Sequence, residues 1–140
     1  MTGNPHPEEL WTLTDVTLVV KKSDLDPGHV TEFLGLQPSA VKAPGFDRWA
    51  PPGGDTDGQW RLRCDEHTTR NFTEQVDIIL QAAERRAKEL ASLRSEGCET
   101  LLAVEGFADN DSQISFSAQA MGRICRLGLS LKLTPNLNER

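Results

Sequence analysis

The sequence predicts an α+β fold in which strands and amphipathic helices alternate within one domain. A short unit occurs twice, at residues 26–38 and 117–133: a capped apolar helix ends in Leu-Gly-Leu, and an extended segment follows. A longer amphipathic helix lies between the two copies, and strand-like runs precede the helices. The order begins with the ferredoxin-like βαββαβ order and adds a C-terminal βαβ unit. We therefore expect a mostly antiparallel sheet of about five or six strands with three helices on one face.

The first strand and helix are predicted by residues 13–36. Residues 13–22 alternate as a strand, and the next segment opens a helix with Asp26 as N-cap and Pro27 at the first helical position, where its missing N–H costs nothing. Gly35 is expected in the left-handed conformation that ends this helix. The apolar face of the strand has three residues: Val16, Leu18 and Val20. The apolar stripe of the helix has three more: Val30, Phe33 and Leu34.

The next region is the least regular of the chain. Residues 38–58 are rich in proline and glycine, so we expect only a short edge strand between Lys42 and Trp49 and a mobile loop over Pro51–Gly58. Residues 59–64 then alternate strictly, as a strand with one buried face does. The side facing the core has three residues: Trp60, Leu62 and Cys64.

One long helix is predicted between Asn71 and Gly97. Asn71 is the expected N-cap, Glu74 completes a capping-box-like start, and Gly97 ends the helix. The helical spacing of apolar residues defines its buried stripe. This stripe consists of Phe72, Val76, Ile79, Leu80, Ala83, Ala87, Leu90 and either Leu93 or Ala91.

The C-terminal part predicts a hairpin, a helix and a last strand. Residues 100–106 and 113–116 are strand-like and are joined by polar turn residues, so we expect them to pair. Ser117 is the expected cap of the next helix. The last strand is expected over residues 129–133 and to end at Pro135, with its leucines facing the core.

Composition restricts the class of protein. The 140 residues carry a net charge of −6, which disfavours binding to nucleic acid, and no apolar run reaches the ~18 residues of a membrane span. The N-terminus lacks the pattern of a secretory signal, and three widely separated cysteines suit reduced thiols, so we expect a cytoplasmic protein. The expected division is a disordered lead-in (1–12), one domain (13–135) and a frayed tail (136–140).

Several short motifs together resemble a bacterial family of domains of unknown function. They are Asp24-Leu25-Asp26-Pro27, Leu34-Gly35-Leu36-Gln37-Pro38, Gly58-Gln59-Trp60, Glu96-Gly97-Cys98 and the second Leu-Gly-Leu. The resemblance covers about residues 15–135 and implies no reaction, cofactor or catalytic residue. By analogy, the small size and acidity also fit an immunity-like protein.

Possible catalytic and metal-binding sets have simpler explanations. Asp24, Asp26 and His29 suit a helix start better than a metal site, and Asp109 with Asp111 suits a polar turn. Four potential zinc ligands, Cys64, His67, Cys98 and Cys125, lack any CxxC pair, and Cys64 and Cys125 fall on apolar faces, where buried thiols are the norm. We therefore expect no catalytic residues, no metal and no cofactor.

The sheet face turned away from the helices is the most distinctive candidate for binding. It is expected to carry Lys21, Arg61, Arg63, Lys132 and neighbouring polar residues, and Trp49 could stack on a ligand. This basic face is either an ordinary solvated surface or a docking surface for an acidic partner or anionic ligand.

The favoured function is a non-catalytic interaction domain, immunity-like or regulatory. The alternative is a small enzyme or small-molecule binder using a cleft beside residues 44–58. A third possibility is a homo-oligomer formed through the sheet.

Overall fold

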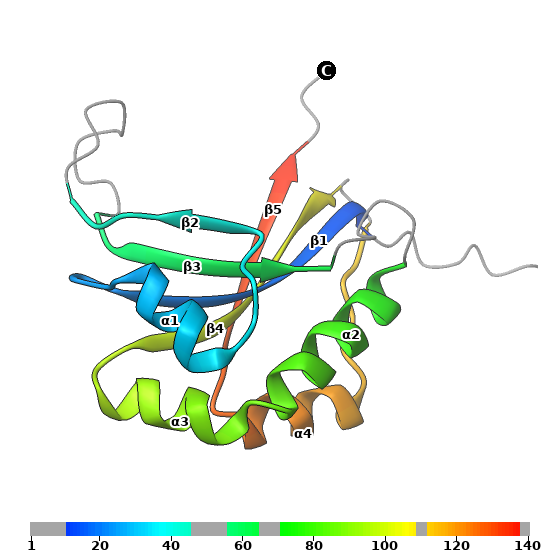
Figure 1. Cartoon of the computed structure of the whole chain (residues 1–140). Coiled ribbons are helices and arrows are strands. Elements are labelled where there is room, and N and C mark those ends of the chain that lie inside the picture. The colour runs from blue at the N-terminus through cyan, green and yellow to red at the C-terminus, as the bar shows by residue number, and fades with distance from the viewer. Residues whose placement is uncertain (1–10, 46–55, 65–70, 109–111, 138–140) are drawn as a thin grey trace, which may run out of the picture.

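A computed structural model describes residues 11–45, 56–64, 71–108 and 112–137 of the chain. This part holds five strands and four helices around one core (Figure 1). The strands are β1 (Thr12–Lys22), β2 (Ala40–Lys42), β3 (Gly58–Arg63), β4 (Glu99–Ala108) and β5 (Ser130–Leu137). The helices are α1 (Pro27–Leu34), α2 (Phe72–Glu84), α3 (Ala87–Ser95) and α4 (Ala118–Arg126). The predicted α+β class is confirmed.

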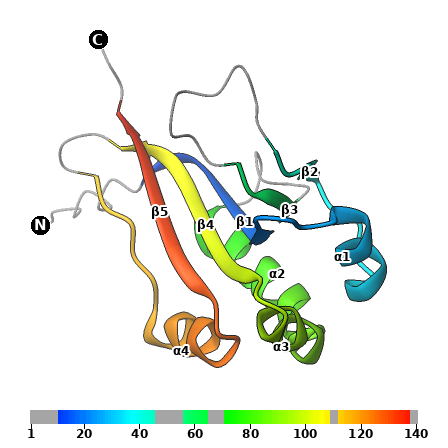
Figure 2. The same ribbon diagram turned by 90° about the vertical axis from the view of Figure 1, so that its left-hand side faces the viewer.

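The strands form one mixed sheet in the order β2-β3-β1-β4-β5. β2–β3, β3–β1 and β1–β4 are antiparallel pairs, whereas β4 and β5 run parallel, side by side in Figure 2. The first four strands therefore have the ferredoxin-like arrangement, and β5 extends it beyond β4. The helices lie together on one side of this sheet, which is the lower side in Figure 1. There are four of them rather than the expected three.

The fourth helix arises because the predicted long helix is broken. α2 ends at Glu84 and α3 starts at Ala87, with Arg86 at φ −123° and ψ 27°, outside helical geometry. α2 packs along β1, whereas α3 packs against β4 and α1, so the two halves follow different neighbours. The residues at the break are polar and offer the core no apolar side chain, so the core does not keep them in a helical conformation. Ala87 and Ala91 are consequently exposed, and Leu90 and Leu93 carry the burial of α3.

The predicted hairpin between residues 100–106 and 113–116 is wrong. β5, rather than the 113–116 segment, lies beside β4, and α4 provides the crossover that a parallel pair needs. Gln113 makes an isolated bridge, in which its carbonyl accepts from the Trp11 N–H at 3.2 Å. Ile114 and Phe116 pack against the core, so their alternation reflects burial without strand pairing. β5 also continues through Pro135 to Leu137, which an edge strand tolerates because one side needs no N–H donor.

The core lies between the sheet and the helices, and most predicted core positions are buried there. Trp60 is fully buried, and its Nε1–H donates to Thr31 Oγ1 at 3.0 Å. Phe33 is an exception: it is 40% exposed and stacks on His29, with ring centroids 5.9 Å apart. α1 is only eight residues long and buries the narrow stripe of Val30 and Leu34, so Phe33 lies outside the contact. Leu133, at the outer edge of the sheet, is likewise exposed.

Gln75 is a buried polar residue that connects α2 to β1. In the described chain β3 pairs with β1 only from Thr17 onward, so no described strand lies on that side of the preceding β1 backbone. The side chain of Gln75, which is 1% exposed, fills the gap: Val16 N–H donates to its Oε1 at 3.2 Å, and its Nε2 donates to Thr14 O at 3.0 Å. Gln75 was not among the predicted core residues because it is polar, although it lies on the buried stripe.

The two Leu-Gly-Leu turns lie at opposite ends of α3. Gly35 and Gly128 have φ of 67° and 68°, the left-handed conformation expected of residues that end helices. Each glycine faces an arginine: a Cβ added at Gly35 would lie 3.5 Å from Arg86 Nη2, and one at Gly128 only 2.6 Å from Arg94 Cζ. Arg94 also donates from Nη1 to Leu127 O at 2.6 Å, which caps the end of α4. The repeated turns thus contact both ends of α3.

We expect Gln75→Leu to lower the free energy of unfolding by about 1 to 3 kcal/mol, because it leaves Val16 N–H and Thr14 C=O buried without partners. Urea denaturation measures the change. Gln37→Leu, at an exposed position, is the control and should stay within about 0.5 kcal/mol of the wild type. Equal stabilities of the two variants would contradict the role assigned to Gln75.

We expect Gly128→Ala to destabilise the protein more than Gly35→Ala does. Both changes force alanine into a left-handed conformation, at a cost of about 1 kcal/mol. Only Gly128→Ala also displaces Arg94 from the Leu127 carbonyl, which adds about another 1 kcal/mol. Thermal melts of both variants, alone and with Arg94→Ala, measure the difference. It should disappear in the Arg94→Ala background, and its persistence there would rule out the steric explanation.

Candidate binding surfaces

The face of the sheet opposite the helices has an apolar centre. We call it the open sheet face, because no helix of the described chain covers it (Figure 1). Val19, Leu101 and Ala103 form an apolar cluster separate from the main core, and they are only 2%, 4% and 7% exposed. Thr17, beside them, is 4% exposed. This centre is therefore shielded from water without a second layer of secondary structure.

Long side chains from neighbouring strands shield the apolar centre. Side chains alternate between the two faces of a strand, so every second residue of β1, β3, β4 and β5 projects onto this face. Val19 lies between Arg61 and Leu101 in the strand register, and Ala103 lies between Thr17 and Lys132. The result is a hollow of about 240 Å³ with an apolar floor. Its polar lining consists of Lys21, Gln59, Arg61, Glu99, Glu105, Lys132 and Thr134.

The predicted binding residues are largely brought together. Lys21, Arg61 and Lys132 line the hollow from three different strands. Arg63 lies farther along β3, opposite Thr17 of β1 and outside the lining of the hollow. Trp49 lies outside the described residues. That these side chains bind a partner stays a prediction.

Acidic residues that the sequence analysis did not place balance most of these cations. Lys21 Nζ lies 3.6 Å from Asp57 Oδ2, and Arg61 Nη2 lies 3.9 Å from Glu105 Oε1. Arg63 Nη1 lies 3.6 Å from Oδ2 of Asp15, which faces Glu105 across β1 and β4. The face is consequently mixed in charge rather than simply basic. Strand order alone brings these acids beside the arginines, so no local sequence signal could have found them.

Lys132 is the exception on this face. Within the described ranges it makes no ion pair, and its side chain is exposed at the rim of the hollow. It extends from β5, the edge strand, and its cross-strand neighbour is the small residue Ala103. Its ammonium group is therefore available to a carboxylate that enters the hollow.

A second concave surface lies between α2 and α4, and we call it the α2–α4 groove. It has a volume of about 550 Å³. Its apolar lining comes from Phe72, Val76, Phe116 and Ala120. Its polar lining comes from Thr73, Glu74, Asp77, Ser115, Ser117, Gln119 and Arg123. The cleft expected beside residues 44–58 falls mainly on residues 46–55, outside the described part.

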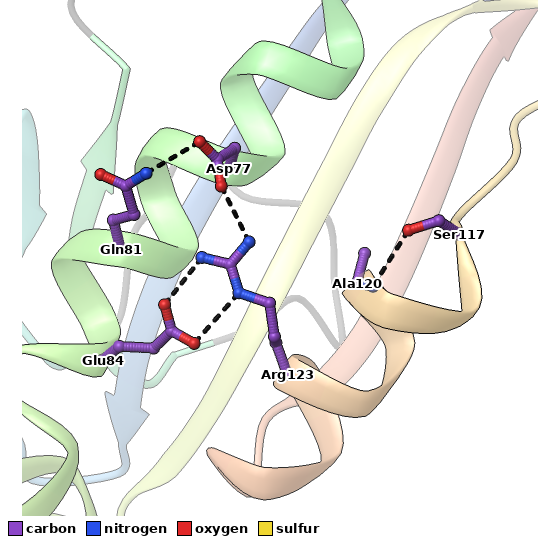
Figure 3. A network of polar contacts seen from close by, with 6 residues as sticks. All are labelled: Asp77, Gln81, Glu84, Ser117, Ala120 and Arg123. Atoms are coloured by element: carbon purple, nitrogen blue, oxygen red, sulfur yellow. Dashed lines mark hydrogen bonds and ion pairs between the residues drawn. The ribbon is translucent and has the colours of Figure 1, made fainter.

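Arg123 ties α4 to α2 at this groove (Figure 3). Its Nε and Nη2 donate to Glu84 Oε2 and Oε1 at 3.0 and 2.7 Å, and its Nη1 donates to Asp77 Oδ1 at 2.8 Å. Gln81 Nε2 donates to the other oxygen of Asp77 at 2.8 Å. The hydrogen bond from Arg123 lowers the pKa of Glu84, and that same bond raises the pKa of Arg123. These hydrogen bonds therefore hold the guanidinium in place, where it joins α4 to α2.

Most of the candidate metal-binding and catalytic residues lie in the described chain. Asp26 caps α1 as predicted, accepting from Gly28 N–H at 3.0 Å and His29 N–H at 3.4 Å. Cys64 and Cys98 are free and buried, and burial raises the pKa of the Cys98 thiol. Cys125, expected on an apolar face, is exposed instead because its position on α4 faces solvent. His67, Asp109 and Asp111 lie outside the described residues.

The described residues contain neither a cluster of metal-ligating side chains nor a membrane-spanning helix. Nowhere among them do three or more His, Cys, Asp or Glu side chains gather in a way that could hold a metal ion. None of the helices there has the length and apolar character needed to cross a membrane.

We expect Arg123→Met to lower the free energy of unfolding by about 1 kcal/mol at pH 7. The folded-state pKa of Glu84 is lowered, so its contribution is present above the unfolded pKa of about 4.3 and is lost as pH falls through the folded pKa. The difference in the free energy of unfolding between the wild type and Arg123→Met should therefore decrease as the pH falls below 4. Urea denaturation at several pH values measures it. In a Glu84→Gln background this difference should be smaller and less pH-dependent, and an unaltered pH profile there would refute the assignment to Glu84.

Comparisons with known proteins agree with the extent of this fold. A search of curated proteins and a search of solved structures each found no match. A family described as a domain of unknown function, DUF4279, matches residues 11–138. The match runs from the start of β1 past the end of β5, so it includes every element described above. This result confirms the resemblance noted in the sequence, and the chain belongs to the DUF4279 family.

Proposed function

We propose that this protein is a non-catalytic interaction domain whose open sheet face docks a protruding acidic element of another protein. The observation that carries the proposal is the buried cluster of Val19, Leu101 and Ala103 at the bottom of a charged hollow on that face. An apolar centre inside a polar rim is the usual anatomy of a protein interface. Such a domain acts by occupying a partner's surface, as an immunity-like or regulatory protein does.

The shape of the hollow favours a protruding element of a different protein. Its volume of about 240 Å³ is below the roughly 300 to 1,000 Å³ of typical small-molecule sites. A symmetric dimer through this face would set two hollows against each other and leave a void at the axis, because an isologous interface pairs the same patch on both copies. A single side chain or tight turn of a partner fills the hollow without such a void.

The charges of the rim favour an acidic partner. Lys132 has no ion pair in the described chain, so a carboxylate can bind it without breaking an existing contact. Arg61 is held at 3.9 Å from Glu105, a long contact that an incoming carboxylate can replace. A basic partner could pair with Glu99, which makes no ion pair in the described chain, but it would compete with Lys21 and Arg61 for Asp57 and Glu105.

The test compares Lys132→Glu with Lys88→Glu, an equal charge change at an exposed position of α3. Partners captured by the immobilised wild-type protein are identified by mass spectrometry, purified and titrated against both variants by calorimetry. We expect Lys132→Glu to weaken binding at least about tenfold, because it sets like charges in contact, and Lys88→Glu to leave it unchanged. Both variants should have the same melting temperature as the wild type.

If the two variants bind the partner with equal affinity, the open sheet face is not part of the interaction. Sedimentation of the wild-type protein tests the alternative of a homo-oligomer. A dimer that dissociates in Lys132→Glu but persists in Lys88→Glu would replace the proposed partner with a second copy of the chain.

A further inference from the structure

We infer that the α2–α4 groove is a second binding site, which takes an uncharged apolar molecule with an aromatic or branched body. The groove lies in the helix layer, and the open sheet face lies on the other side of the sheet. The two sites share no residue. This inference is therefore independent of the proposed function.

The apolar lining and the size of the groove fit a small organic molecule. The volume of about 550 Å³ falls within the roughly 300 to 1,000 Å³ typical of small-molecule sites. Phe72 and Phe116 meet edge to face, with ring centroids 5.2 Å apart, and both rings line the groove. Val76 and Ala120 complete the apolar surface from α2 and α4. A flat or branched apolar body can pack against this surface.

The polar groups of the groove include donors for one acceptor. Ser117 Oγ accepts from Ala120 N–H at 3.0 Å (Figure 3), and its hydroxyl hydrogen has no acceptor among the described residues, so it can donate to a ligand. The first N–H groups of α4 have no acceptor within the helix and lie at the same end of the groove. A carbonyl or ether oxygen on the ligand can therefore bind there.

The electrostatics of the groove disfavour both signs of charge. An anionic ligand meets the carboxylates of Glu74 and Asp77, and the one guanidinium of the lining, that of Arg123, already donates to Asp77 and Glu84. A cationic ligand gains little from Asp77, whose two oxygens already accept from Arg123 and Gln81, and it meets the N-termini of α2 and α4, where the helix dipoles are positive. An uncharged ligand avoids both penalties, and charge complementarity thus selects it.

The experiment uses two matched fluorescent probes. N-phenyl-1-naphthylamine is uncharged and apolar, and 8-anilino-1-naphthalenesulfonate is nearly the same molecule with an added negative charge. We expect saturable binding of the uncharged probe, one per chain, and at least tenfold weaker binding of the sulfonate. Unsaturable binding of the uncharged probe, or equal affinity for both probes, would overturn the inference.

Three tryptophan substitutions on α4 then locate the site. Ala120→Trp fills the groove and Gln119→Trp blocks its mouth, so each should weaken the binding of the uncharged probe at least tenfold. Met121→Trp, at an exposed position of the same helix outside the groove, should leave its affinity unchanged. Gln119 is exposed, so this variant keeps the test valid if Ala120→Trp does not fold. Equal affinity in Gln119→Trp and Met121→Trp would place the probe elsewhere and refute the site.

Discussion

β1 is the central strand of the sheet, yet among the described residues it has strands on both sides only from Thr17 onward. Before that residue, the side chain of Gln75 replaces the missing strand by bonding both Thr14 O and Val16 N–H. Buried backbone groups must be paired, so this contact lets the core continue past the end of β3. It also sets the position of α2 along β1. Because α2 forms one wall of the α2–α4 groove, the groove depends on the same two hydrogen bonds.

The position of α4 depends on contacts with both halves of the broken helix. Arg123 joins it to Asp77 and Glu84 of α2, and Arg94 of α3 binds the carbonyl of Leu127 where α4 ends. α4 in turn delivers the chain to β5, whose parallel pairing with β4 brings Lys132 beside Ala103. The open sheet face and the α2–α4 groove therefore share a support, although they lie on different sides of the sheet.

Local signals in the sequence predicted most of the elements, and tertiary context decided the rest. Asp26, Gly35 and Ser117 act through their own backbone neighbourhoods, so their capping roles were readable from residue type and spacing. Ile114 and Phe116 alternate like strand residues, but burial beneath a sheet produces the same alternation as strand pairing. The break at Arg86 was unpredictable for a related reason: no proline or glycine marks it, and it follows from what α2 and α3 each contact.

The open sheet face shows the same division between local and tertiary information. The alternation of β3 predicts that Arg61 and Arg63 share a side, but only the strand order places Glu105 and Asp15 beside them. These pairings hold the arginine side chains across the sheet, where their aliphatic stems help to keep Val19 and its neighbours dry. A protein that needed no partner here could cover such a centre entirely with paired charges. Among the described residues Lys132 makes no ion pair beside the hollow, and the proposed docking of an acidic element rests on this ammonium group rather than on the net charge of the face.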